Sequence, residues 1–299
     1  KNSNRDFTKR DFVREGLKIG LAHEQQLGVN PFQLGIIGGT DSHNGLMSDV
    51  AEDTFIGGHG PEDGTVDRRR TGGVGGWIDG PDLSIGSISG VWAPQNTRAA
   101  IFDAMKRRET FATSGPRIKV RLFGGSDLTL DNDDPVKMVE EGYAKGVPMG
   151  AMLPAATQSP VFTVYAEKDA DGANLDRIQV IKGWLDRDGQ THEQIIDVVW
   201  SGERQADASG KLPAVGNTVD LTTALYTNDI GAATLMGTWQ DGDFDPQQRA
   251  FYYARVIEIP TPRWSTYDAV RNDLPLLKEV PATIQERAWT SPIWYSPQG

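Results

Sequence analysis

The sequence predicts an α/β segment over residues 1–150 and an all-β domain over residues 151–299. Two amphipathic patterns in the first segment, over 8–28 and 96–108, repeat apolar residues every three or four positions and indicate helices. Beyond residue 150 helix signals nearly vanish and strand patterns follow one another at short intervals. This is typical of an antiparallel β-sandwich. Asp, Gly and Pro cluster over 124–158, so we place the domain boundary there.

The first helix has clear end signals. Thr8 with Asp11 three residues later is typical of a capping box, and Gly28 with Pro31 ends the helix. The apolar run 34–37 follows at once and predicts a buried strand that stops at a glycine pair.

Residues 57–90 are rich in Gly, Asp and Arg and show little periodicity. We interpret them as one long, ordered loop over the active face, because loops of this length are usually functional. Apolar side chains are available to hold it in place: Trp77, Ile78, Ile85 and Ile88.

The second helix, 96–108, is expected to be capped by Asn96 and to pack through Ile101, Phe102 and Met105. Strand patterns follow it, and Asp186 to Gly189 is typical of a hairpin turn. The strand-like segments are 110–113, 118–123, 161–165, 178–185, 194–200, 218–221, 250–259 and 281–294.

Composition excludes several classes of function. The chain has 30 Lys and Arg against 41 Asp and Glu, a net charge of −11, which argues against nucleic acid as a partner. It has no cysteine, so disulfides, cysteine zinc sites and cysteine nucleophiles are excluded. No apolar run is long enough to cross a membrane. The chain begins at Lys1 without Met, so we expect a processed product or a fragment, and we favour a periplasmic or secreted location over the cytoplasm.

Thr40-Asp41-Ser42-His43-Asn44 is the most informative motif. Side chains two residues apart on extended backbone point the same way, so Asp41 and His43 can reach one ion. A carboxylate with an imidazole suits Zn, Mn or Fe. The alternative is an ordinary turn, whose composition the motif also fits.

Three further residues are candidates for the same site. His59, in a glycine-rich stretch, is a candidate acid, base or substrate contact, unless it is an ordinary loop histidine. Arg69, within the run 68–70, and Arg117 are candidate contacts for an anionic group of a substrate. Such a basic run is otherwise solvated or paired with nearby acids such as Glu62 and Asp63.

Four blocks of the sequence resemble a bacterial domain-of-unknown-function family, numbered 3604. The first runs from Asn30 to His43 and contains the Asp-x-His motif, and the second joins 97–102 to 108–118 around Ser114-Gly115-Pro116. The other two lie at 238–245 (Thr-Trp-Gln-Asp-Gly-Asp-Phe-Asp) and 287–297. The resemblance therefore runs through nearly the whole chain.

That family is similar to PHP-type metal-dependent phosphoesterases, which fold as a distorted β/α barrel. The resemblance implies that residues 1–150 are the C-terminal portion of such a barrel, with Asp41 and His43 as ligands of a multinuclear centre. PHP proteins open with a His-x-His motif, which this chain lacks. The resemblance thus implies an N-terminal portion that is missing here, and a metal site that is incomplete in this chain.

We therefore expect the C-terminal part of a metal-dependent hydrolase, inactive by itself, whose metals activate water to attack a phosphoester or related ester of a small anionic substrate. One alternative is a non-catalytic module whose β-sandwich binds a glycan or a protein partner, with the α/β part as support. Another is a structural domain that only completes the barrel.

Overall fold

Two antiparallel sheets form the centre of the molecule. The computed structural model describes residues 7–46, 50–76, 78–129, 134–155, 158–208 and 210–297. The larger sheet has seven strands in the order β3-β4-β14-β11-β8-β9, with β15 paired to β11. Its strands are β3 (Ile88–Val91), β4 (Thr110–Thr113), β8 (Leu175–Leu185), β9 (Thr191–Trp200), β11 (Arg249–Glu258), β14 (Arg287–Thr290) and β15 (Ile293–Tyr295).

The smaller sheet has four strands in the order β10-β7-β5-β6. Its strands are β5 (Lys119–Gly125), β6 (Val147–Pro148), β7 (Val161–Glu167) and β10 (Thr234–Gln240). Strand pairing crosses residue 150, because β5 pairs with β7 and β4 pairs with β14. The division of the chain at that residue stays a prediction.

The main core lies between the two sheets and follows from the alternation of side chains along each strand. On β11, Tyr252 and Ala254 face the smaller sheet, whereas Phe251 and Tyr253 face the opposite way. Residues from β5, β7, β8 and β14 complete the inner core, and the large members among them are fully buried.

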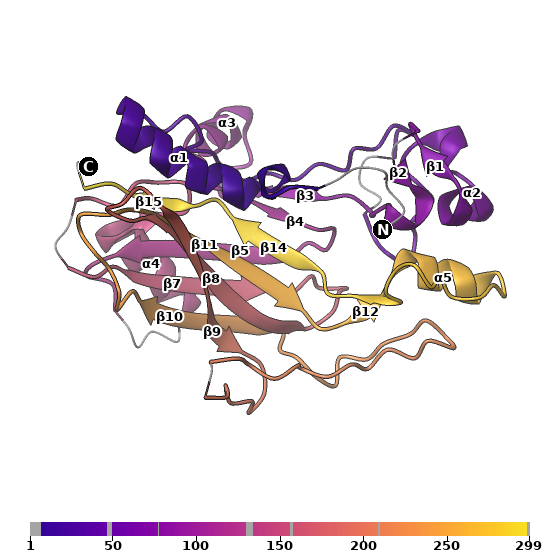
Figure 1. Cartoon of the computed structure of the whole chain (residues 1–299). Helices are drawn as coiled ribbons and strands as arrows, with labels where there is room; N and C mark the ends of the chain where they lie inside the picture. The colour runs from indigo at the N-terminus through magenta and orange to yellow at the C-terminus, as the bar shows by residue number, and fades with distance from the viewer. Residues whose placement is uncertain are drawn as a thin grey trace.

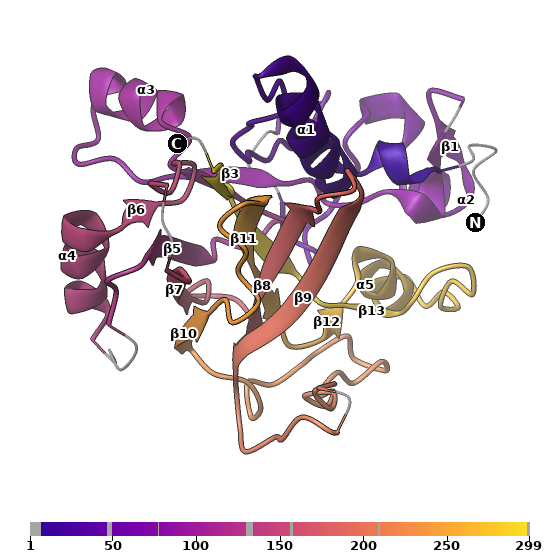
Figure 2. The same cartoon turned by 60° about the vertical axis from the view of Figure 1, so that its left-hand side comes forward.

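Helices cover the outer faces of both sheets (Figures 1 and 2). α1 (Val13–Leu27) packs Leu17 and Leu21 onto the outer face of the larger sheet. α4 (Pro135–Lys145) packs Met138 onto Phe123 of the smaller sheet. α3 (Arg98–Lys106) precedes β4 and buries Ala104.

A separate small unit lies at one end of the sheets, where the segment from 50 to 85 meets α5 (Figure 1). Phe55, Leu83 and Trp264 share its apolar core, and the Trp264 indole donates a hydrogen bond to the Leu83 carbonyl. Its elements are η2 (Gly60–Glu62), α2 (Val66–Thr71), β1 (Gly73–Val74), β2 (Ile78–Asp79), η3 (Gly80–Asp82), β12 (Thr261–Pro262), α5 (Trp264–Arg271) and β13 (Thr283–Ile284).

Several sequence predictions are confirmed. The capping box of Thr8 and Asp11 is present, although it caps the short 3-10 turn η1 (Lys9–Asp11) that leads into α1. Gly28 ends α1 with a φ of 75°. The hairpin of β8 and β9 turns at the predicted place, and β4 matches the predicted strand 110–113.

Other predictions are wrong. Residues 34–37 form no strand, and Leu34 and Ile37 are exposed, because this segment has no place in either ladder. Thr97 caps α3 instead of Asn96, and Phe102 and Met105 are exposed there. Residues 57–90 are not one loop, since they contain α2 and short strands.

The predicted strand 218–221 is reduced to a single bridge, whereas α4 and α5 were not expected. α4 has a clear start signal that composition obscured: Asp134 accepts from the Val136 and Lys137 amides, and Pro135 is the first helical residue. Trp77 lies outside the described residues.

The observed class is mixed α/β with mostly antiparallel sheet. Among the strands that the structure describes, none close into a barrel, so the barrel that the resemblance implied is not confirmed. No helix in the described ranges is long and apolar enough to cross a bilayer.

Candidate metal centre

The Asp41–His43 motif lies in a turn that is anchored to the glycine stretch before His59. Asp41 adopts a φ of 50°, a left-handed conformation that Asp tolerates better than most residues. The His43 amide donates to the Gly58 carbonyl over 2.6 Å, and the Asn44 side chain donates to the Gly57 carbonyl over 2.8 Å. These bonds hold the two segments together, although His43 and His59 lie 16 positions apart in the sequence.

Asp41, His43 and His59 each point one possible ligand atom into a group in which all such atoms lie within 4.8 Å of one another. His43 Nε2 is 3.1 Å from Asp41 Oδ1, and the two imidazole rings stack with centroids 4.9 Å apart. Two nitrogens and one oxygen are thus gathered at one point of the surface. Asp41 and His43 are brought together as predicted, but by a turn and not by extended backbone.

His59 is the most firmly held member of this group. Its Nδ1 lies 3.1 Å from Oδ2 of Asp63, whose side chain is completely buried. Asp63 also accepts the backbone amides of Gly58 and His59, over 2.7 and 2.8 Å. An ionised carboxylate only accepts hydrogen bonds, so Nδ1 is the donor in this contact, which leaves Nε2 as the ring nitrogen that can offer a lone pair to a metal.

Gly57 makes this arrangement possible. Its φ is 92°, and a Cβ atom there would lie 2.6 Å from Cγ of Asp63. Glycine is therefore the residue that lets the chain turn closely around the Asp63 carboxylate.

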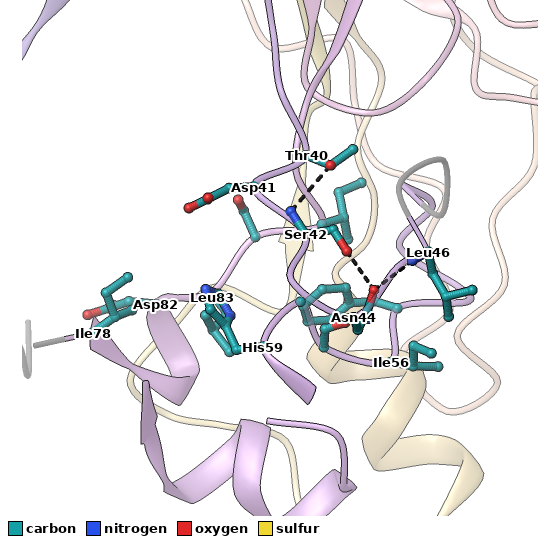
Figure 3. Close-up of a pocket in the computed structure, with 15 residues that line it drawn as sticks. Thr40, Asp41, Ser42, Asn44, Leu46, Ile56, His59, Ile78, Asp82 and Leu83 are labelled. Carbon is teal, nitrogen blue, oxygen red and sulfur yellow. Dashed lines mark hydrogen bonds between the residues drawn. The ribbon is translucent and has the colours of Figure 1, made fainter. Parts of the chain in front are cut away.

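A pocket of about 160 Å³ adjoins the group. Figure 3 shows the His59 ring and the Asp41 carboxylate on one side of it, whereas Asn44 and Leu46 line the other side. The Asn44 side chain accepts hydrogen bonds from Ser42 Oγ and from the Leu46 amide, which fixes the turn on that side. The pocket has room for an ion with its water and one compact polar group.

The donor set suits a divalent transition metal. Bonds of about 2.0–2.2 Å to each ligand place tetrahedral ligand atoms about 3.4 Å apart. Reaching that spacing requires the side chains of Asp41 and His43 to rotate inward, and both are free to do so because they are 85 % and 61 % exposed. The His59 side chain is only 19 % exposed and provides the fixed reference.

The two arginine candidates lie elsewhere. The buried Arg69 side chain forms a two-pronged ion pair with Asp268 of α5, over 2.6 and 2.8 Å. Its partner is therefore neither Glu62 nor Asp63, and this geometry does not favour an anion contact. Arg117 is exposed beside a second cavity, where its backbone amide donates to Asp169 over 2.7 Å. Neither arginine lines the pocket beside Asp41.

The sequence did not identify Asp63 as the residue that supports His59. The only sequence signal is a carboxylate four positions after a histidine, His59-Gly-Pro-Glu-Asp63. That spacing brings two side chains together on a helix, and here η2 provides a single 3-10 turn between them.

These features define a mixed α/β protein with a candidate metal site of two histidines and one aspartate, supported by a buried carboxylate. The chain belongs to the family described as protein of unknown function (DUF3604), whose model matches residues 1–297. No curated protein and no solved structure matches the chain.

Proposed function

We propose that this chain is part of a metal-dependent hydrolase in which Asp41, His43 and His59 hold a divalent cation, Zn, Mn or Fe. The observation that carries the proposal is the convergence of their three donor atoms within 4.8 Å. Three protein ligands of this kind, with a further position left to solvent, are the usual donor set of catalytic sites for these metals.

The surrounding residues support a binding role for this group. Asp63 fixes the tautomer and the orientation of His59, as carboxylates behind metal-binding histidines generally do. His59 thereby acts in this proposal as a third ligand, in place of the general acid or base that its sequence position suggested. The bound cation supplies Lewis acidity, which activates water for attack on a phosphoester or a related ester.

The remaining residues of the pocket position the substrate. Ser42 and Asn44 present a hydroxyl and an amide beside the donor group, and Ile56 and Leu83 provide apolar walls. The hydrogen bonds of Asn44 to Ser42, Leu46 and Gly57 hold this side of the pocket in shape for a small ester. The similarity to PHP-type phosphoesterases, given above as a resemblance, agrees with a phosphoester as the substrate.

We further propose that a separate portion of polypeptide contributes additional ligands and makes the centre multinuclear. Apolar side chains near the site support a covering partner, because large exposed apolar patches usually mark interfaces. Leu46 and Ile56 are exposed and line the pocket beside the donor group, and Phe12, Val13 and Ile37 are exposed along a further groove of the surface.

Metal content and hydrolysis test the proposal together. After loading with Zn, Mn or Fe and removal of free metal, we expect about one ion per chain. Asp41→Ala, His43→Ala and His59→Ala should each lower metal content and any hydrolysis of p-nitrophenyl phosphate esters in parallel. His192→Ala is the matched control, because His192 also pairs with a carboxylate, Asp186, at 2.6 Å but belongs to no group of three such donors in the part of the chain that the structure describes. Unchanged metal content in all three variants would contradict the proposal.

A further inference from the structure

A second cavity, of about 320 Å³, lies apart from the candidate metal centre, between the segment after Val50 and the ends of β7 and β11. Its lining carries much more negative than positive charge. One arginine, Arg117, accompanies six carboxyl side chains: Glu52, Asp53, Asp169, Asp171, Glu258 and Glu286.

Two of these carboxyl groups are buried, and one of them is incompletely bonded. Glu258 is 1 % exposed and Glu286 is 4 % exposed. Oε1 of Glu258 has no hydrogen-bond partner among the described residues, whereas the Glu286 carboxyl group shares a hydrogen bond with that of Glu52 and accepts another from the Ser114 hydroxyl. A buried carboxylate oxygen without a donor costs free energy, so its presence requires a compensating group.

The nearby cations of the chain direct their hydrogen bonds elsewhere. The Lys168 ammonium donates to the carbonyls of Asp169, Ala170 and Gly172, over 2.9, 3.1 and 2.9 Å. The Arg263 guanidinium donates to the carbonyls of Pro81 and Leu83. Both groups therefore hydrogen-bond to backbone carbonyls, although the charge of Lys168 acts on Glu258 and that of Arg263 acts on Glu52 and Glu286.

Burial raises the pKa of Glu258 well above its usual range, and the negative charges of Glu286 and Asp169 raise it further. Burial likewise raises the pKa of Glu52, followed by the effect of Glu286. Without a ligand these groups retain protons to unusually high pH, so a cation that binds between them displaces those protons.

The spacing of the carboxyl groups and the volume of the cavity favour an organic cation over a metal ion. In the described part of the chain, Asp41, His43 and His59 form the one group of three such donors within 4.8 Å. No three of the cavity's carboxyl groups therefore meet as closely as the ligands of that candidate metal site. The cavity volume also lies in the range of small-molecule pockets and far exceeds that of one ion.

We infer that this cavity binds a small organic cation, an ammonium or guanidinium group, through Glu258 and Glu286, with Tyr226 and Tyr267 as walls. The several N–H groups of such a cation can reach more than one of these carboxyl groups at once. They also supply the missing donor to Oε1 of Glu258. The site is independent of the proposed hydrolase, since no donor of the metal group lines it.

Isothermal titration of the whole chain with 1,4-diaminobutane and with agmatine tests this inference. We expect saturable binding of at least one probe, and a loss of affinity of about tenfold or more in Glu258→Gln or Glu286→Gln, as for one charge-assisted hydrogen bond. Glu279→Gln, at an exposed position outside the cavity, is the control and should bind as the unchanged chain does. His59→Ala should also bind normally, which separates this site from the metal centre.

A second measurement uses only the unchanged chain, so its result does not depend on whether a variant folds. A bound cation raises the unfolding midpoint by mass action, so diaminobutane should raise it more than NaCl at equal ionic strength. The absence of saturable binding in the low millimolar range, or equal affinity in the Gln variants, would overturn the inference. Binding of Ca²⁺ or Mg²⁺ that is lost in Glu258→Gln while neither amine binds would also overturn it, and would identify a metal site.

Discussion

The buried carboxylate of Asp63 lies 3.1 Å from His59 Nδ1 and also accepts the backbone amide of His59. One residue thus fixes both the ring and the backbone of the histidine on which the candidate metal centre depends. Asp41 and His43, by contrast, are exposed and hydrogen-bonded mainly to each other and to the opposite loop.

The first prediction concerns Asp63→Asn. An amide presents one acceptor in place of two, so it cannot accept from His59 and from both backbone amides as Asp63 does. We expect zinc affinity to fall about 10–100-fold, the usual effect of removing such a supporting group. Titration with zinc measures this, with Asp67→Asn on the exposed face of α2 as control. Equal zinc affinity in the two variants would show that Asp63 has only a structural role.

The second prediction concerns the ion pair of Arg69 and Asp268, which joins α2 to α5. Removing one partner leaves a buried charge alone, so Arg69→Ala should lower the free energy of unfolding by about 3–5 kcal/mol. Urea unfolding measures it, and Arg68→Ala, at an exposed neighbouring position, should have a much smaller effect. If Arg69→Ala unfolds like the unchanged chain but loses hydrolysis, the residue contacts substrate after all.

The third prediction concerns Asp241, which follows β10 of the smaller sheet. It accepts hydrogen bonds from Lys182 of the larger sheet and from Tyr252, over 2.8 and 2.7 Å, in a buried position. Asp241→Asn leaves the Lys182 ammonium without a counter-charge and should lower the free energy of unfolding by about 3 kcal/mol.

Asp245→Asn is the matched control for this pair, because Asp245 pairs with the exposed Arg187. Its unfolding curve in urea should stay close to that of the unchanged chain. A loss in Asp241→Asn no larger than in Asp245→Asn would show that the Lys182 charge is compensated in another way.

The fourth prediction concerns pH. Burial first, then Glu286 and Asp169, raise the pKa of Glu258 above its ordinary value of 4.5, against the opposing effect of Lys168. The folded chain therefore retains a proton that the unfolded chain releases. This contribution to stability is complete below about pH 4.5 and is lost as pH rises through the folded pKa.

Glu258→Gln mimics the protonated group at every pH. We expect the variant to gain stability relative to the unchanged chain between about pH 5 and about pH 8, measured by urea unfolding at both values. The difference in free energy of unfolding between the variant and the unchanged chain removes the contribution of the other titrating groups, which both chains share. A constant difference across this range would mean that Glu258 is ionised in the folded state.

Local patterns in the sequence predicted much of the framework. The alternation along β8, β9 and β11, the turn at Asp186 to Gly189 and the end of α1 at Gly28 all follow from contacts or dihedral preferences within a few residues. The pairing of Asp41 with His43 was predictable for the same reason, because the two residues are near neighbours in the chain.

The tertiary structure alone decided the rest. The sequence could not show that 34–37 stays outside both sheets, because a strand exists only where a partner strand accepts its hydrogen bonds. It could not join Arg69 to Asp268, which lie 199 positions apart. Nor could it gather Glu52, Glu258 and Glu286 in one cavity, since their meeting depends on how the sheets bring distant loops together. The sequence by itself determined many of the elements and paired two of the three donors of the candidate metal site. It offered His59 only as a candidate, and the hydrogen bonds between two loops brought that residue to the other two.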